Sequence, residues 1–145
     1  MVHHLILRII SKLLIGPILL FGLYVQFHGD VGPGGGFQAG VIFAVAFVLY
    51  ALVFGLDRLK CLFSEKTIHS LAASGVLIYA GIGIMTMLKK ANFLDYNALS
   101  KSALMGQHLG ILVVEFGIGV TVFAVILTIY YGFASRKPSF NDKDW

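Results

Sequence analysis

Four long apolar stretches, separated by short polar segments, dominate this sequence. They cover residues 5–27, 37–56, 70–88 and 106–133. A helix needs about 20 mostly apolar residues to cross the hydrocarbon core of a bilayer. Inside lipid, a helix also satisfies all of its own backbone hydrogen bonds. The sequence therefore predicts an all-α integral membrane protein with four transmembrane helices, which form a single membrane domain over residues 1–145.

The composition agrees with a membrane protein and argues against a soluble one. Of the 145 residues, 58% are hydrophobic and 12% are charged, whereas soluble domains average about 25% charged residues. The net charge of +4 comes without a long run of Lys or Arg, so we expect no nucleic-acid partner. We expect a multi-pass protein of the plasma membrane, surrounded by the lipid bilayer.

The basic residues of the polar segments predict the orientation, because Lys and Arg in short loops concentrate on the cytoplasmic side. Eight of them lie on one side of the predicted helices: Arg8, Lys12, Arg58, Lys60, Lys66, Arg136, Lys137 and Lys143. Three lie on the other side: Lys89, Lys90 and Lys101. This asymmetry predicts that both termini are cytoplasmic, including the polar tail of residues 134–145.

Glu115 is an acidic residue inside a predicted helix. It lies about nine residues, or roughly 13 Å, from the start of the fourth apolar stretch. A carboxylate at such a depth has to face protein or water and find a partner there. A desolvated carboxyl group can also hold a proton near neutral pH, as a proton relay requires. Glu115 is therefore a candidate for an ion or proton pathway; the alternative is a carboxylate that only hydrogen-bonds a neighbouring helix.

Two other ionisable residues are candidates for the same pathway. His108 lies two helical turns before Glu115, on nearly the same face, and water could bridge the separation of roughly 10 Å. The alternative for His108 is an interfacial histidine at a helix end. Lys12 lies about seven residues into the first apolar stretch. It either extends to the membrane interface or pairs with a carboxylate of another helix or subunit.

The segment between the first two predicted helices is rich in glycine. It reads His28-Gly29-Asp30-Val31-Gly32-Pro33-Gly34-Gly35-Gly36-Phe37. Glycine permits positive φ angles and close approach of another backbone, but a nucleotide-binding P-loop would need a following Gly-Lys-Ser/Thr. We expect a tight external turn that contacts another subunit. Alternatively, His28 and Asp30 bind a cation transiently.

No cofactor or metal site is expected. The single cysteine, Cys61, offers neither a disulfide framework nor a cysteine-based metal site. A bis-histidine haem needs two histidines at matching depth on facing helices, whereas His28, His69 and His108 all lie at predicted helix ends. Because the predicted helices also carry no nucleophile with an evident base, we do not expect an enzyme.

Two motifs resemble those of a known family. The stretch from Phe27 to Val41, with its Pro-Gly-Gly-Gly-Phe core, resembles the signature of the MrpB/MnhB family, whose members are small subunits of multisubunit Na⁺/H⁺ antiporters. That signature is roughly G-H-x-x-P-G-G-G-F-x-x-G, and here the first two residues are reversed, as His28-Gly29. The run from Glu115 to Val120 is similar to the acidic residue followed by Gly-Val in the last helix of the family, where many members carry Asp.

The resemblance implies a small membrane subunit of a complex that exchanges cytoplasmic Na⁺ for external H⁺, lining or supporting an ion pathway. Its partners would be other membrane subunits, two of them related to the pumps of respiratory complex I. Related small subunits occur in membrane-bound hydrogenases, so a membrane-arm subunit of such a respiratory complex is the alternative, as is a purely scaffolding subunit. Independently of the resemblance, this chain has too few intramembrane charges for the coupled exchange of two cations, which favours a subunit over a complete transporter.

Overall fold

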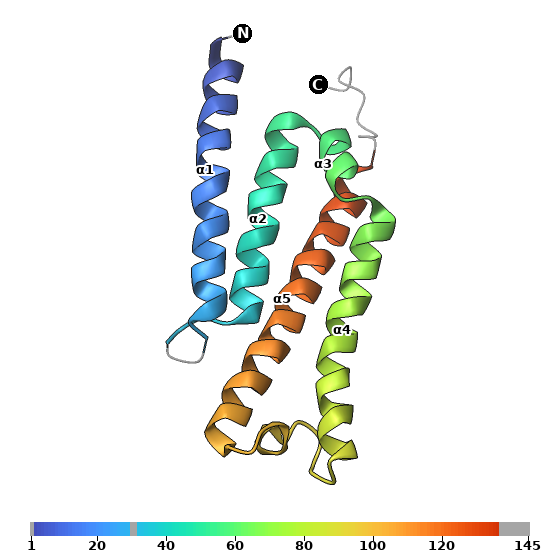
Figure 1. Ribbon diagram of the computed structural model, residues 1–145. Coiled ribbons are helices and arrows are strands. Elements are labelled where there is room, and N and C mark those ends of the chain that lie inside the picture. The colour runs from blue at the N-terminus through green and yellow to red at the C-terminus, as the bar shows by residue number, and fades with distance from the viewer. Residues whose placement is uncertain (1, 30–31, 137–145) are drawn as a thin grey trace.

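The computed structural model describes residues 2–29 and 32–136, and the regular elements in these two ranges are all helices (Figure 1). They are α1 (Val2–Phe27), α2 (Gly36–Phe54), α3 (Leu56–Leu62), α4 (Glu65–Leu88), the 3₁₀-helix η1 (Tyr96–Leu99) and α5 (Ala103–Ala134). Four of these, α1, α2, α4 and α5, are long and apolar enough to cross a membrane. The prediction of an all-α chain with four such helices is confirmed.

The helix boundaries differ from the predicted ones where capping residues decide them. Helix α4 begins five residues before the predicted 70, because the Ser64 hydroxyl accepts a hydrogen bond from Thr67 N–H at 3.2 Å and caps the helix. Helix α2 ends at Phe54, before the predicted 56. The next residue, Gly55, has φ of 101°, a conformation that favours glycine and interrupts the helix.

The long helices form an open layer and not a closed four-helix bundle. Helix α2 packs against α1 and α5, and α5 packs against α4, so that the order across the layer is α1, α2, α5, α4 (Figure 1). Each helix keeps much of its apolar surface exposed, α1 most of all. A helix that is apolar on all sides belongs inside a large protein or a membrane. Lipid or other subunits must therefore cover both faces of this layer.

The start of α1 and the end of α5 lie at the same end of the layer, together with α3; we call this the α3 end (Figure 1). The main buried cluster lies here and consists of Ala51, Leu59, Ile68, Ala124, Leu127 and Tyr131. The Tyr131 hydroxyl donates a 2.7 Å hydrogen bond to Phe63 O, which ties α5 to the segment after α3. The opposite end, which carries the loop from α4 to α5, is called the η1 end.

The glycine loop between α1 and α2 does not reach the η1 end. Helix α2 begins at Gly36, directly against the backbone of Glu115, whereas α5 begins at Ala103, about 18 Å further along its axis. Figure 1 shows the described residues of the loop well short of the ends of α4 and α5. The described residues of the loop lie beside the middle part of α5, at the level of Glu115.

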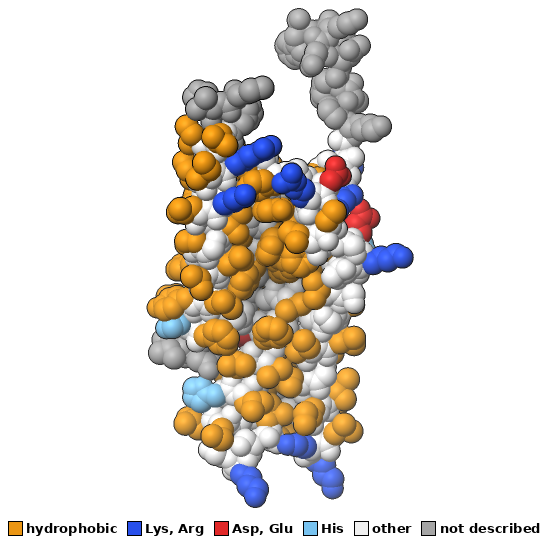
Figure 2. Space-filling model, turned by 45° about the horizontal axis from the view of Figure 1, so that its top comes forward, with side chains coloured by type: hydrophobic (Ala, Val, Ile, Leu, Met, Phe, Trp, Pro, Cys, Tyr) orange, Lys and Arg blue, Asp and Glu red, His pale blue; other side chains and the backbone are white. Residues whose placement is uncertain are grey.

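Exposed apolar side chains continue past the level of this loop. Ile84, Met85 and Leu88 of α4 and Leu104, Met105 and Leu109 of α5 are all exposed. In the space-filling view, Lys and Arg side chains gather at the two ends of the molecule, with hydrophobic side chains between them (Figure 2). The exposed apolar surface of α4 and α5 therefore extends beyond the level of the glycine loop.

Candidate functional site

The carboxylate of Glu115 lies against the glycine loop. A Cβ atom added to Gly29 would lie 2.7 Å from Glu115 Cδ and even closer to both carboxylate oxygens. A Cβ atom added to Gly35 would lie 2.8 Å from Glu115 Oε1. Because real Cβ atoms essentially never come this close, a side chain at position 29 or 35 would force the carboxylate to move from the place that it occupies. The structure thus joins the two features that the sequence showed separately.

The described residues of the loop fold back on the last turn of α1. Gly35 N–H donates a 3.1 Å hydrogen bond to Val25 O, and His28 N–H donates one of 3.3 Å to the same oxygen. Gly35 has φ of 121°, which a side chain would strain. At Gly36, a Cβ atom would collide with the backbone carbonyl of Glu115. The consecutive glycines therefore turn the chain back onto α1 and bring α2 into backbone contact with α5.

Gln26 of α1 is a further polar residue of this site, which the sequence did not single out. A cavity of about 10 Å³ is lined by Gln26, Phe27, Gly29, Leu112 and Glu115, and such a space holds about one water molecule. Gln26 Oε1 lies 2.9 Å from the position that a Cβ atom of Gly119 would take, one helical turn after Glu115. The only sequence signal for Gln26 is an amide near the end of an apolar stretch.

Beyond Gln26, toward the α3 end, the surroundings become apolar. An open cavity of about 220 Å³ lies between α1, α2 and α5. Its lining consists of Leu23, Gln26, Phe27, Phe43, Phe47, Phe116, Gly119, Val120 and Phe123. Gln26 is the one residue of this lining with a polar side chain, so in the described chain the polar part of the site ends at this amide.

The two histidine candidates lie at the surface of the chain. His28 is exposed; its Nδ1–H donates a 2.9 Å hydrogen bond to Tyr24 O, and its ring stacks on Tyr24 at 3.8 Å between centroids. His108 is exposed on α5, seven residues before Glu115, as the sequence indicated. Asp30 of the loop motif lies outside the described residues. Pro33 and Phe37 are exposed beside the glycines.

Lys12 is not part of this site. It is exposed near the α3 end, with Nζ 5.6 Å from the centroid of the Phe54 ring at the end of α2. Gln26 lies about 21 Å further along α1. An ammonium group over an aromatic ring has a favourable cation–π contact, which suits the interfacial alternative that the sequence left open for Lys12.

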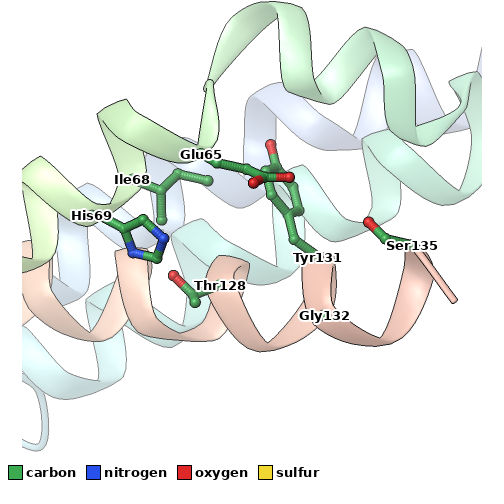
Figure 3. A pocket seen from close by; sticks show the side chains of 7 residues that line it. All are labelled: Glu65, Ile68, His69, Thr128, Tyr131, Gly132 and Ser135. Atoms are coloured by element: carbon green, nitrogen blue, oxygen red, sulfur yellow. The ribbon is translucent and has the colours of Figure 1, made fainter.

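A larger cavity lies at the α3 end, between α4 and α5, with a volume of about 270 Å³ (Figure 3). Its lining consists of Glu65, Ile68, His69, Thr128, Tyr131, Gly132 and Ser135. Several of its polar groups already have partners within the chain. Glu65 pairs with Lys60 at 2.8 Å, and the Thr128 hydroxyl donates to Ala124 O at 2.9 Å. The ion pair joins α3 to the start of α4, whereas the Thr128 hydrogen bond stays within α5, and neither leads toward Glu115.

Comparison with known proteins agrees with the motifs. Residues 6–128 match the model of a domain related to the MnhB subunit of Na⁺/H⁺ antiporter. A protein of Staphylococcus aureus (strain Newman), named "Putative antiporter subunit mnhB2", is 36% identical over 128 residues, which cover 86% of this chain and 89% of the relative. A protein of the same name from Staphylococcus haemolyticus (strain JCSC1435) is 34% identical over 139 residues, which cover 91% of this chain and 95% of the relative.

Proposed function

This chain belongs to the family of MnhB subunits of Na⁺/H⁺ antiporters, and we propose that Glu115 carries protons on an ion pathway of such a multisubunit antiporter in the plasma membrane. The observation that carries the proposal is the contact between the Glu115 carboxylate and the glycine loop. A carboxylate held at a defined position beside a water-sized cavity can take up and release a proton. The names of the relatives favour the antiporter complex over the hydrogenase-type complex that the sequence left open.

The glycine loop supports this role by positioning the acid. Gly29 and Gly35 leave space for the carboxylate, and Gly36 brings the start of α2 onto the α5 backbone at Glu115. Because packed backbone cannot shift easily, the acid stays at one place relative to both helices. Within the described part of its four long helices, the chain has two acidic residues: Glu65 at the start of α4 and Glu115 in α5. Coupling of H⁺ to Na⁺ is therefore assigned to partner subunits, which also cover the exposed faces of the layer.

The α3 end is assigned to the cytoplasm. The described chain carries Arg8, Lys12, Arg58, Lys60, Lys66 and Arg136 near this end, in accord with the concentration of basic residues on the cytoplasmic side. Glu115 then lies toward the outer side of the membrane, where it would exchange protons with the external solution.

The test replaces Glu115 by Gln in the assembled complex and measures Na⁺-dependent proton flux in inverted membrane vesicles with a pH-sensitive dye. Glu115→Gln should lower the flux about tenfold or more, while the amount of the subunit and of its co-purifying partners stays unchanged. Glu115→Asp should retain part of the flux, because it keeps an acid. The matched control is Glu65→Gln, which removes an exposed carboxylate at the other end and should leave the flux unchanged.

A normal flux in the assembled Glu115→Gln complex would contradict the proposal. Glu115 would then be a structural carboxylate, and the subunit would act as a scaffold.

A further inference from the structure

The open apolar cavity between α1, α2 and α5 has the properties of a binding groove. Five of its nine lining residues are phenylalanines, namely Phe27, Phe43, Phe47, Phe116 and Phe123, and we call it the phenylalanine groove. Its volume of about 220 Å³ is too small for a helix of another subunit, since one helical turn with its side chains fills roughly 400 Å³. Membrane helices also pack closely at small residues, whereas rings dominate this lining.

The aromatic lining of the groove continues along α2 toward the α3 end. Four aromatic residues of α2 share one face of the helix, because they are spaced four, three and four residues apart: Phe43, Phe47, Tyr50 and Phe54. The rings of Tyr50 and Phe54 lie 4.9 Å apart between centroids. On α1, Lys12 precedes Leu23 of the groove by eleven residues, or three helical turns, so both lie on nearly the same face.

A cationic group lies at the α3 end of this aromatic face. Lys12 Nζ is 5.6 Å from the centroid of the Phe54 ring, and Arg8 lies one turn earlier on α1. Both basic residues are exposed, and neither pairs with a carboxylate of the described residues. Lys12 lies roughly 16 Å from Leu23 along the helix axis. This distance is close to the depth of one bilayer leaflet, which is about 15 Å of hydrocarbon.

We propose that the phenylalanine groove binds one acyl chain of an anionic phospholipid whose phosphate lies at Lys12 and Arg8. The chain extends from Lys12 past Phe54 and Tyr50 into the groove, and the amide of Gln26 marks the far end of the apolar lining. Basic groups beside membrane helices on the cytoplasmic side bind anionic headgroups. The α3 end is the one assigned to the cytoplasm, and Figure 2 shows Lys and Arg side chains next to hydrophobic ones there.

The test places the full complex in phosphatidylcholine vesicles that contain a small fraction of phosphatidylglycerol with a photoreactive diazirine near the end of one acyl chain. Mass spectrometry of the peptides of this subunit locates the label. The label on Phe43 and Phe47 is divided by the label on Leu77, an exposed residue of α4 outside the groove. This ratio should be about fivefold or more higher than with photoreactive phosphatidylcholine, because each nearby Lys or Arg favours an anionic lipid by about fivefold.

Substitution of Lys12 tests the headgroup contact. Lys12→Gln should lower the phosphatidylglycerol ratio about fivefold, whereas Lys12→Arg should keep it. The matched control is Lys66→Gln, which removes an exposed cation at the same end from α4, a helix that does not line the groove. This control should leave the ratio unchanged.

Substitution of Leu23 tests the acyl-chain contact. Leu23→Trp should fill part of the groove and lower the label on Phe43 and Phe47 with either lipid. Leu20→Trp is the control, because Leu20 is exposed on the same helix but does not line the groove. It should leave the label unchanged.

Equal ratios for the two photoreactive lipids in the unchanged complex would show contact with bulk lipid only and overturn the proposal. A phosphatidylglycerol preference that survives Lys12→Gln would overturn it too, because the headgroup would lie elsewhere. Absence of lipid label in the groove, together with crosslinks from the groove to another subunit, would show a protein occupant instead. The label is read without transport, so the result does not depend on the role of Glu115.

Discussion

At the scale of single residues, Glu115 and the glycines of the loop form one unit. The carboxylate occupies the space that side chains at positions 29 and 35 would take. At both positions, glycine therefore leaves space for the carboxylate, and this role is separate from turn formation. Gly29 is the cleaner case, because Gly35 also has a positive φ that would strain any side chain.

Gly29→Ala should displace the Glu115 carboxylate and lower Na⁺-dependent proton flux about tenfold, since a misplacement of about 1 Å can be this costly. Glu115→Asp in the same chain should restore part of the flux, because the shorter acid withdraws from the added methyl group. The control is Gly32→Ala, whose methyl group meets nothing within 4 Å. Equal flux in the two alanine variants would contradict the steric account of Gly29.

At the scale of helices, close backbone contacts at glycines join α5 to α4 and to α2. Gly75 of α4 faces Gly117 and Thr121 of α5, and Gly40 of α2 faces Gly119. Lipid provides no hydrophobic drive for helices to associate, so association depends on such close packing. These contacts explain why glycine stands at positions 75, 117 and 119. Gly81 and Gly16 make no such contact, since a Cβ atom at either would meet nothing within 4 Å.

Gly75→Ala should push α4 away from α5 and destabilise the subunit by about 1–3 kcal/mol, the usual cost of overpacking. Thermal unfolding followed by size-exclusion chromatography of the detergent-solubilised protein would measure the change. Gly81→Ala, in the same helix, should be neutral or slightly stabilising because alanine favours helix formation. A stable Gly75→Ala variant would mean that the α4–α5 contact is looser than described.

The loop from α4 to α5 depends on one fully buried hydroxyl. Thr86 Oγ1 accepts a 3.1 Å hydrogen bond from Leu94 N–H and lies 2.8 Å from Gly83 O and 3.0 Å from Asn92 O. Lys90 and Leu94 have positive φ angles in this loop. The hydroxyl therefore holds a strained backbone in place.

Thr86→Val keeps the shape of the side chain but leaves the N–H of Leu94 without its acceptor. The expected cost is about 1–3 kcal/mol, measured by the same thermal assay. Thr128→Val serves as the control, because the Thr128 hydroxyl donates to Ala124 O within its own helix and ties no loop to it. If both valine variants unfold at the same temperature, the Thr86 hydrogen bonds do not stabilise the loop.

At the scale of the whole molecule, the chain is an open layer whose charged residues lie mostly at its two ends (Figure 2). Such a layer has two large apolar faces and is complete only within lipid and a larger complex. The assignment of the α3 end to the cytoplasm rests on basic residues and is directly testable, because the native Cys61 of α3 is exposed there.

An impermeant maleimide should label Cys61 in inverted vesicles and not in intact cells. In a Cys61→Ser background, Lys101→Cys at the η1 end should show the opposite pattern, since Lys101 is also exposed. Labelling of Cys61 in intact cells would reverse the orientation and place Glu115 toward the cytoplasm.

Hydropathy and length alone determined that this chain has four membrane-spanning helices, because the cost of unsatisfied backbone in lipid is local to each segment. The charge of the short loops led to an orientation, because the preference of Lys and Arg for the cytoplasmic side is also a local property of each loop. The sequence also identified Glu115 and the glycine loop, since an acid in a predicted membrane helix and consecutive glycines are visible without coordinates.

Only the tertiary structure decided that these two features meet. Gly29 and Glu115 are far apart in the sequence, and their contact depends on where α2 packs along α5. The same packing places the loop beside the middle part of α5 and brings Gln26 beside Gly119. Hydropathy shows that a helix crosses the membrane but not how neighbouring helices are shifted along one another. Close contacts between backbones determine that shift, and they bring the glycines at positions 29, 35 and 36 against Glu115.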